Sequence, residues 1–294
     1  MKEIIQKRLV ILLIISLSLN LAFGLFFIGK IAIKYEQYKI SKQEIKGAVF
    51  NRWNSFDMIE FSFNGVNAKF VFPNQKEKLN QQKYWIWRTQ FWGEEPQVDI
   101  ALLKKGFCLV YVNVVDQYGS NNTMVRFNDF YKFMIKNFNL KSKVVLEGMS
   151  RGGLDAYNWA SENTDKVYCI YADAPVCDLK SWPGGLGKGK GSKEDWNKCL
   201  KAYGLTKLTV DNYRNMPIYN CKKIAEAKIP VLHVCGDKDS IVPIDENTYK
   251  LAETFRRAGG NIQIIVKKGK GHHPHSLKDP TPIVDFILEN TINK

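Results

Sequence analysis

Residues 144–153, VVLEGMSRGG, decide the fold that the sequence predicts. The apolar run VVLE is typical of a buried strand, and the following GLDAYNWASEN can form a helix. Between them, Gly148 to Gly152 match the pattern GxSxG, in which a serine occupies a strained turn from strand to helix and small neighbours let the backbone pack closely. Glycine and serine at such a turn can also simply shape the loop. If the pattern is functional, the Ser150 hydroxyl lies exposed at the carboxyl end of a parallel sheet, beside a helix N-terminus that favours negative charge.

Strand-like and helix-like segments alternate on both sides of this turn. Apolar runs of strand length cover residues 84–91, 106–115, 143–150, 166–176, 229–239 and 261–271. Segments with helical character, such as 126–138 and 247–259, separate most of them. Near the start, two β-rich runs flank Asn64-Gly65, which is a strong signal for an antiparallel hairpin. The sequence therefore predicts an α/β protein with a mostly parallel sheet and helices on both faces.

An exposed serine becomes a nucleophile only when a base takes its proton and an acid orients that base. The later strand ends supply both partners, because GDKDSIVP follows the run 229–235 and GKGHHPH follows the run 261–268. We predict that Ser150 is the nucleophile, with Asp239 as the acid and His272 as the base. Three alternatives remain open for these two partners: Asp237, His273 and His275. The remaining histidine, His233, lies within an apolar strand and is expected to be a core residue.

These motifs resemble those of the α/β-hydrolase superfamily, in particular its serine esterase and prolyl-oligopeptidase-like branches. In that superfamily the acid is the second aspartate of GDxDxxVP and the base is the histidine of GxGH, so the resemblance assigns Asp239 and His272 to these roles and Ser150 to the nucleophile. It extends over residues 55–292 and implies an α/β-hydrolase fold with a mostly parallel eight-stranded sheet. Stretches such as EGMSRGGLDAYNWA also resemble bacterial hydrolases found beside or fused to carbohydrate O-acetylesterases.

The oxyanion-binding loop departs from the pattern of many esterases. Those enzymes carry HG or HGGG after the third strand, whereas this chain has WRTQ at residues 87–90. The backbone NH of Arg151, the residue after the nucleophile, is expected to be one donor. The second is predicted to be the NH of Thr89 or of Gln90, since losing one donor typically costs about 2.7–4 kcal/mol of transition-state stabilisation.

Three further side chains are candidates for substrate binding. Arg88 is predicted either to bind an anionic substrate group or to form a salt bridge with Glu94 or Glu95. Trp92 and Trp182 are predicted to line a groove for sugar rings or an apolar acyl chain, although core packing explains some of the aromatic side chains in these segments.

The chain divides into three predicted regions. Residues 1–34 read as a membrane anchor or signal peptide, because the run 9–29 carries no charge and is long enough to cross a bilayer. Residues 35–54 are predicted to be a linker, and 55–294 the catalytic domain, with a lid-like insertion at about 178–228. We expect a single-pass protein of the cell membrane with an extracytoplasmic catalytic domain, or a secreted protein if the first segment is cleaved.

Composition limits the partners. The net charge of +14 comes mostly from lysines spread along the chain, and no basic run is interleaved with aromatics in a nucleic-acid-binding module, so no nucleic-acid partner is predicted. Six cysteines show no CxxC spacing, although Cys177, Cys199 and Cys221 could include one disulfide. The HHPH run lacks an acidic or cysteine partner at ligand spacing, so neither a metal site nor a cofactor is predicted.

The sequence leaves three hypotheses for function. The first is a serine hydrolase that cleaves carboxylic esters through an acyl-enzyme intermediate, with acylated carbohydrates as one substrate class. The second is a serine peptidase of the prolyl-oligopeptidase-like type, for which the short segment before Phe56 is not expected to supply a peptide-recognition domain. The third is a noncatalytic surface-binding protein on the same fold, which is not expected to keep serine, aspartate and histidine together.

Overall fold

The computed structural model describes residues 16–21, 45, 47–73 and 83–292 of the 294-residue chain. The chain divides into two compact units, Met1–Lys46 and Gly47–Lys294, and the fold described below is that of the second unit. Most of the predicted anchor or signal peptide lies outside the described residues. Its described part, residues 16–21, is helical. Within the described part of the chain, no helix has both the length and the apolar character required for a membrane span.

The sheet of the second unit starts with three antiparallel strands, β1 (Val49–Trp53), β2 (Phe56–Phe63) and β3 (Val66–Val71). Asn64 and Gly65 join β2 to β3 with φ angles of 46° and 80°, a left-handed conformation that Asn-Gly pairs adopt readily. The predicted hairpin is therefore confirmed. Strand β1 pairs along β2 and lies within residues 35–54, the predicted linker, where no strand was expected.

The remaining strands are parallel to one another, as the alternation of strands and helices predicts. They are β4 (Trp85–Arg88), β5 (Cys108–Val112), β6 (Val144–Met149), β7 (Val167–Asp173), β8 (Val231–Gly236) and β9 (Ile262–Lys267). The order across the sheet is β1-β2-β3-β5-β4-β6-β7-β8-β9. The α/β-hydrolase fold class is confirmed, and the described residues form nine strands where eight were expected, the difference being β1 at the edge.

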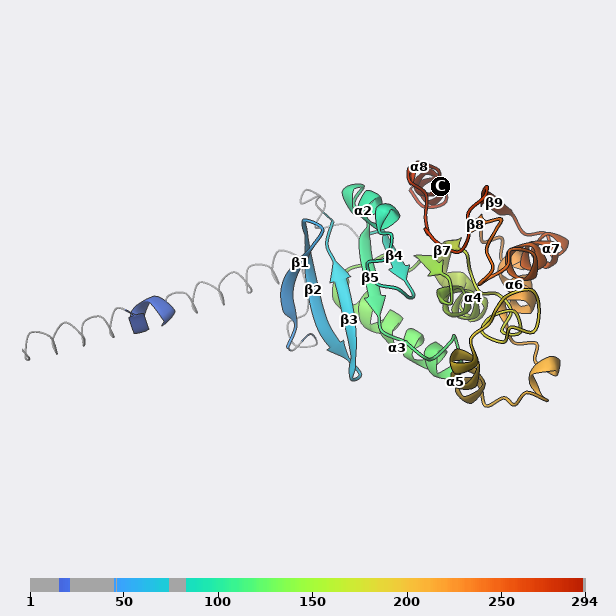
Figure 1. The fold of residues 1–294 in the computed structure, drawn as a ribbon. Coiled ribbons are helices and arrows are strands. Elements are labelled where there is room, and N and C mark those ends of the chain that lie inside the picture. Colours follow the sequence, from blue (N-terminus) through green and yellow to red (C-terminus); the bar gives the residue numbers. More distant parts are fainter. Residues whose placement is uncertain (1–15, 22–44, 46, 74–82, 293–294) are drawn as a thin grey trace, which may run out of the picture. The chain divides into compact units, whose positions relative to one another are not determined.

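Helices cover both faces of the sheet (Figure 1). Helices α2 (Gln97–Lys104) and α8 (Thr281–Glu289) lie together on one face, and α3 (Asn121–Phe138) and α4 (Gly152–Glu162) lie on the other. The buried core under α2 and α8 joins their apolar side chains to those of the central strands, for example Leu102 and Ile283 with Val145. Because the parallel strands are covered on both sides, they read as nearly continuous apolar runs.

The insertion after β7 is folded and packs against the rest of the second unit. It contains α5 (Lys193–Tyr203) and α6 (Pro217–Glu226), and the chain then continues through β8 to α7 (Lys250–Arg257). Ser192 caps α5 by accepting a hydrogen bond from the Asp195 backbone NH at 3.2 Å. Trp196 of α5 joins a buried cluster with Leu154 of α4, which anchors the insertion. The disulfide considered among the cysteines of this region is not formed, since all six cysteines are free and buried.

Candidate active site

Ser150 occupies a strained turn between β6 and α4. Its φ is 48°, a left-handed value that a residue with a side chain adopts at a cost. Two hydrogen bonds hold the turn: the Ser150 NH donates to the Asp173 carbonyl at 2.8 Å, and the Val176 NH donates to the Ser150 carbonyl at 2.9 Å. A side chain does not fit at Gly153, because a Cβ there would lie 2.6 Å from the Cβ of Pro175.

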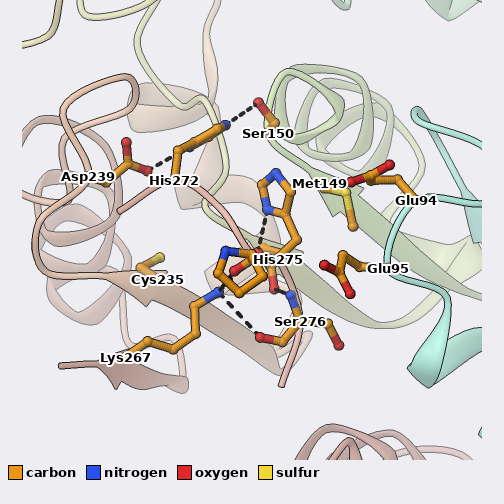
Figure 2. A network of polar contacts seen from close by, with 12 residues as sticks. Glu94, Glu95, Met149, Ser150, Cys235, Asp239, Lys267, His272, His275 and Ser276 are labelled. Carbon is orange, nitrogen blue, oxygen red and sulfur yellow. Dashed lines mark hydrogen bonds and ion pairs between the residues drawn. The ribbon is translucent and has the colours of Figure 1, made fainter. Parts of the chain in front are cut away.

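The predicted base and acid meet the serine in one hydrogen-bonded line (Figure 2). Nε2 of His272 lies 2.9 Å from the Ser150 Oγ, and Nδ1 of His272 lies 2.6 Å from Oδ2 of Asp239. The other carboxylate oxygen of Asp239 accepts the backbone NH groups of Ile241 at 2.9 Å and Val242 at 2.8 Å. With Asp239 bonded to Nδ1–H, the neutral imidazole presents the lone pair of Nε2 to the serine hydroxyl.

The competing residues have other partners. Asp237 is partly exposed and accepts the Gly269 NH at 2.6 Å, so it caps the neighbouring turn. His233 is fully buried, with Nε2 at 2.6 Å from the Tyr157 hydroxyl and Nδ1 at 2.9 Å from the Thr248 hydroxyl. Burial lowers the pKa of His233 to about 3, which keeps it neutral in the core.

The two oxyanion candidates in the β4 loop differ in availability. The Thr89 NH donates to the Glu147 carbonyl at 3.0 Å, so it extends the sheet and is not free to bind an oxyanion. The prediction that included Thr89 is therefore corrected. The NH groups of Gln90 and Arg151 have no hydrogen-bond acceptor among the described residues. The Arg151 NH adjoins Ser150, and the β4 loop approaches α4 so closely that a Cβ on Gly152 would lie 3.1 Å from Gln90 Cβ.

Gln90 is held by a carboxylate that the sequence analysis did not single out. Its side-chain amide donates to Oδ2 of Asp155 at 3.0 Å, and both residues are buried. Burial raises the pKa of Asp155 to about 7, against the smaller opposing effects of Gln90 and Arg151. Asp155 thus holds the Gln90 side chain of the β4 loop in place. A signal was present, since an aspartate in the first turn after the serine lies on the side of α4 that packs against the loop.

Arg88 does not line a substrate site. Its side chain is 1% exposed and forms ion pairs with Asp99 and, at 3.2 Å, with Glu147. It also donates to the carbonyls of Phe91, at 3.0 Å, and Glu94. Burial alone would lower the pKa of Arg88, but the two carboxylates raise it above its ordinary value. The prediction of substrate binding is wrong for this residue, because it braces the β4 loop from within the core. The alternative prediction of a salt bridge is right in kind, although the partners are not Glu94 or Glu95 side chains.

The two tryptophans lie in different surroundings. Trp92 is partly buried, with ring centroids 5.1 Å from Trp53 and 5.5 Å from Tyr111, so packing accounts for it. Trp182 of the insertion lies 6.2 Å from the ring of Tyr118. Contact of either ring with substrate stays a prediction.

The insertion reaches the residue beside the nucleophile. The Tyr118 hydroxyl donates to Asp195 of α5 at 2.6 Å, and the Arg151 guanidinium lies 3.6 Å from the same carboxylate. The guanidinium also lies over the Phe91 ring at 5.2 Å. The side chain of Arg151 is thus held by the insertion while its backbone NH stays free beside Ser150.

A second histidine–aspartate pair lies under the triad (Figure 2). Nδ1 of His275 is 2.7 Å from Oδ1 of Asp173, at the carboxyl end of β7. The other oxygen of Asp173 accepts the Ser276 NH at 2.7 Å and the Tyr171 hydroxyl at 2.9 Å. Burial alone would raise the pKa of Asp173, but His275 and the nearby Lys267 hold it below its ordinary value. The sequence signal was an acid, Asp173, at the carboxyl end of a predicted strand, the same kind of position as that of the triad acid.

His273, the third histidine of the loop, is exposed and packs against the other two rings. Its ring centroid lies 5.1 Å from that of His272 and 4.8 Å from that of His275. Partial burial, followed by the two neighbouring imidazoles, lowers the pKa of His273 below its ordinary value. From the sequence, the three histidines were alternatives for the catalytic base. In the structure their rings lie together in one cluster.

The sequence profile of the prolyl oligopeptidase family matches residues 102–291, which include all three members of the triad. The chain belongs to the prolyl oligopeptidase family. No curated protein sequence matches it.

Solved structures share the fold at low identity. Acylaminoacyl peptidase from Pyrococcus horikoshii has 16% identity and a TM-score of 0.60, over 84% of this chain and 42% of that one. Est1E from Butyrivibrio proteoclasticus has 18% identity and a TM-score of 0.55, over 85% of this chain and 100% of that one. An S-formylglutathione hydrolase from Agrobacterium tumefaciens has 12% identity and a TM-score of 0.58, over 82% of this chain and 97% of that one.

This chain therefore spans less than half the length of the P. horikoshii peptidase but nearly all of the other two proteins.

Proposed function

We propose that this member of the prolyl oligopeptidase family hydrolyses carboxylic esters through an acyl-enzyme intermediate. The observation that carries the proposal is the hydrogen-bonded line from Ser150 through His272 to Asp239, with separations of 2.9 Å and 2.6 Å. A serine already bonded to a neutral imidazole can lose its proton as it attacks, and the base is held in the required tautomer by a buried carboxylate.

Acylation starts with attack by the Ser150 Oγ on the ester carbonyl carbon. Nε2 of His272 takes the hydroxyl proton, and the Asp239 carboxylate stabilises the resulting imidazolium. The carbonyl oxygen becomes an oxyanion, for which the free NH groups of Gln90 and Arg151 are the donors. The imidazolium then gives its proton to the departing alkoxide, which leaves as the alcohol.

Deacylation repeats these steps with water. His272 takes a proton from the water as its oxygen attacks the acyl carbon, the same two NH groups bind the new oxyanion, and the imidazolium returns a proton to Ser150 Oγ as the carboxylic acid leaves. No step requires a metal or an organic cofactor.

Ester cleavage is the first candidate, because it requires only the triad and the two NH donors; the fold is shared with hydrolases and peptidases alike. The chain matches Est1E and the S-formylglutathione hydrolase over nearly their whole length, and the P. horikoshii peptidase over 42% of its length. Acylated carbohydrates are one substrate class for this site, with Trp182 beside Tyr118 as the surface for a sugar ring. Peptide hydrolysis is the second candidate, since the family includes peptidases.

The location that we propose is extracytoplasmic, with the catalytic domain tethered to the cell membrane or released from it. Its support is the uncharged apolar run 9–29, which has the length of a membrane span. Fractionation of cells that produce the tagged full-length chain tests this. Recovery of the protein in the cytoplasmic fraction would contradict it.

The test of function compares the full-length chain with Ser150→Ala. We expect the wild type to hydrolyse p-nitrophenyl acetate and to be labelled by a fluorophosphonate, and the variant to do neither. A parallel series of p-nitrophenyl butyrate, p-nitrophenyl octanoate and aminoacyl p-nitroanilides separates acyl length from peptide preference. Faster turnover of an anilide than of every ester would favour the peptidase, and activity that survives Ser150→Ala would refute the proposed nucleophile.

A further inference from the structure

The loop between β9 and α8 contains three histidines in a geometry that the triad alone does not require. Ring centroids of His272, His273 and His275 are 4.8–5.1 Å apart, and each pair of ring planes meets at 79–85°. One nitrogen from each ring lies within 4.8 Å of the others. The three imidazoles thus surround a single point with their planes nearly perpendicular.

This arrangement is close to that of three imidazoles around a tetrahedral ion. With Zn–N bonds of about 2.0–2.1 Å, ring centroids around zinc are separated by roughly 5 Å and the bound nitrogens by roughly 3.3 Å. The centroid separations already agree. The nitrogens have to close by at most about 1.5 Å from their present limit of 4.8 Å, which the exposed His273 can provide by rotating its side chain.

The surroundings of the two buried rings also match those of metal ligands. A ligating histidine almost always donates its other ring NH to a carboxylate or carbonyl, which fixes the ring and raises its basicity. His272 donates from Nδ1 to Asp239 and His275 donates from Nδ1 to Asp173, at 2.6 Å and 2.7 Å. In His275, Nε2 is therefore the nitrogen left for a further partner, and in His272 the Nε2 contacts the Ser150 hydroxyl at 2.9 Å, which a metal ion would have to displace. The hydrolysis steps give the second pair, His275 and Asp173, no role.

We propose that His272, His273 and His275 bind one divalent transition-metal ion, Zn²⁺ being the natural candidate, and that the bound ion reversibly inhibits the enzyme. The inhibition, but not the binding, rests on the proposed function. Nε2 of His272 has a single lone pair, which either accepts the Ser150 proton or coordinates the metal. While the ion is bound, the base is lost, and chelation of the ion restores it.

The histidine content makes the site testable without interference. The chain has four histidines, and the fourth, His233, is fully buried with both ring nitrogens hydrogen-bonded. A single class of tight imidazole site is therefore expected. His273 is exposed, so His273→Ala removes one ligand without opening the core, and the exposed Lys278 on the same loop provides a matched control.

Binding is measured first and without reference to turnover. EDTA-treated full-length protein is titrated with Zn²⁺ by calorimetry, and with Co²⁺ by its visible absorption. We expect one ion per chain for the wild type, Ser150→Ala and Lys278→Ala. His273→Ala should weaken binding at least about tenfold, since even loss of an outer partner of a ligand typically costs 10–100-fold. Equal affinity in His273→Ala and the wild type, or no saturable binding, would overturn the site.

Inhibition is measured second, with each variant compared with its own rate in EDTA. Zn²⁺ should inhibit wild-type ester hydrolysis with a midpoint near the dissociation constant, excess EDTA should restore the rate, and the midpoint for His273→Ala should rise by the same factor as its dissociation constant. Tight binding without inhibition would show that His272 is not a ligand and would overturn the proposal. If no ester is hydrolysed at all, the proposed function fails while the calorimetry still decides the site.

Discussion

Replacing Gly152 with alanine tests whether the β4 loop supplies the second oxyanion donor. Gly152 begins α4, and a Cβ built on it would lie 2.8 Å from Oγ1 of Thr89 and 3.1 Å from Cβ of Gln90. The threonine cannot simply turn away, because its hydroxyl donates to the carbonyls of Glu147 at 3.0 Å and Gly152 at 2.9 Å. The loop as a whole must therefore move away from the serine.

The size of the effect follows from the displacement. Ordinary contact begins at 3.4 Å, so the separation of 2.8 Å has to increase by about 0.6 Å. A donor NH works within about 2.7–3.1 Å of the oxyanion, and a shift of this size takes the Gln90 NH out of that range. Complete loss of one donor costs about 2.7–4 kcal/mol, so we expect kcat to fall by about 10²–10³-fold. Overpacking should lower the free energy of unfolding by about 1–3 kcal/mol.

The assay is steady-state hydrolysis of p-nitrophenyl acetate, with urea unfolding to confirm that the variant is folded under assay conditions. Gly271→Ala is the matched control: it precedes His272, yet its nearest atom outside the adjoining residues would be the Lys238 carbonyl oxygen at an ordinary 3.7 Å. It should keep most of the wild-type kcat. A kcat for Gly152→Ala within about threefold of wild type, or an equal loss in Gly271→Ala, would refute the assignment of the Gln90 NH.

Two further predictions concern buried charges. Because burial raises the pKa of Asp155 from 3.8 to about 7, the native state holds its proton more tightly than the unfolded chain, and this contribution to stability is complete below about pH 4 and is lost as the pH rises through 7. Asp155→Asn should remove this pH-dependent loss of stability, and its amide oxygen can still accept the hydrogen bond from Gln90. In urea unfolding, the free energy of unfolding of the variant should therefore rise relative to that of wild type between pH 5 and pH 8. Parallel pH profiles of the two proteins would contradict this. Arg88→Met leaves Asp99 and Glu147 buried without their cation and should lower the free energy of unfolding by about 3–5 kcal/mol, with KM unchanged in the folded fraction. A raised KM at wild-type stability would restore the substrate-binding interpretation of Arg88.

Local sequence patterns predict most of the fold. The Asn64-Gly65 hairpin, the apolar strand runs and the GxSxG turn are each encoded within about ten residues, and each appears in the structure where the pattern placed it. Strand β1 was missed because it lies at the edge of the sheet with side chains that are exposed or only partly buried, so it carries neither a continuous apolar run nor a clear alternation. The insertion was located by its length and glycine content, but its packing through Trp196 depends on distant partners.

The errors in the site have a common physical origin. An arginine at the end of a strand has the same local sequence whether it faces substrate or the core. Only Asp99 and Glu147, which come from another helix and another strand, decide that Arg88 is buried. The choice between Thr89 and Gln90 likewise depends on which NH pairs with the Glu147 carbonyl across the sheet, a matter of strand register.

The same reasoning explains why the HHPH spacing predicts no metal site whereas the fold supports the site proposed above. In HHPH the distance along the chain says nothing about ring orientation. That orientation is imposed by two carboxylates, Asp239 after β8 and Asp173 at the end of β7, each of which takes one Nδ1. Parallel strands bring their carboxyl ends to one edge of the sheet, so acids from neighbouring strands converge on a single loop. A protein that orients one histidine in this way, with a second oriented histidine whose ring centroid lies 4.8 Å away, holds two of the three imidazole ligands of the proposed zinc site in place.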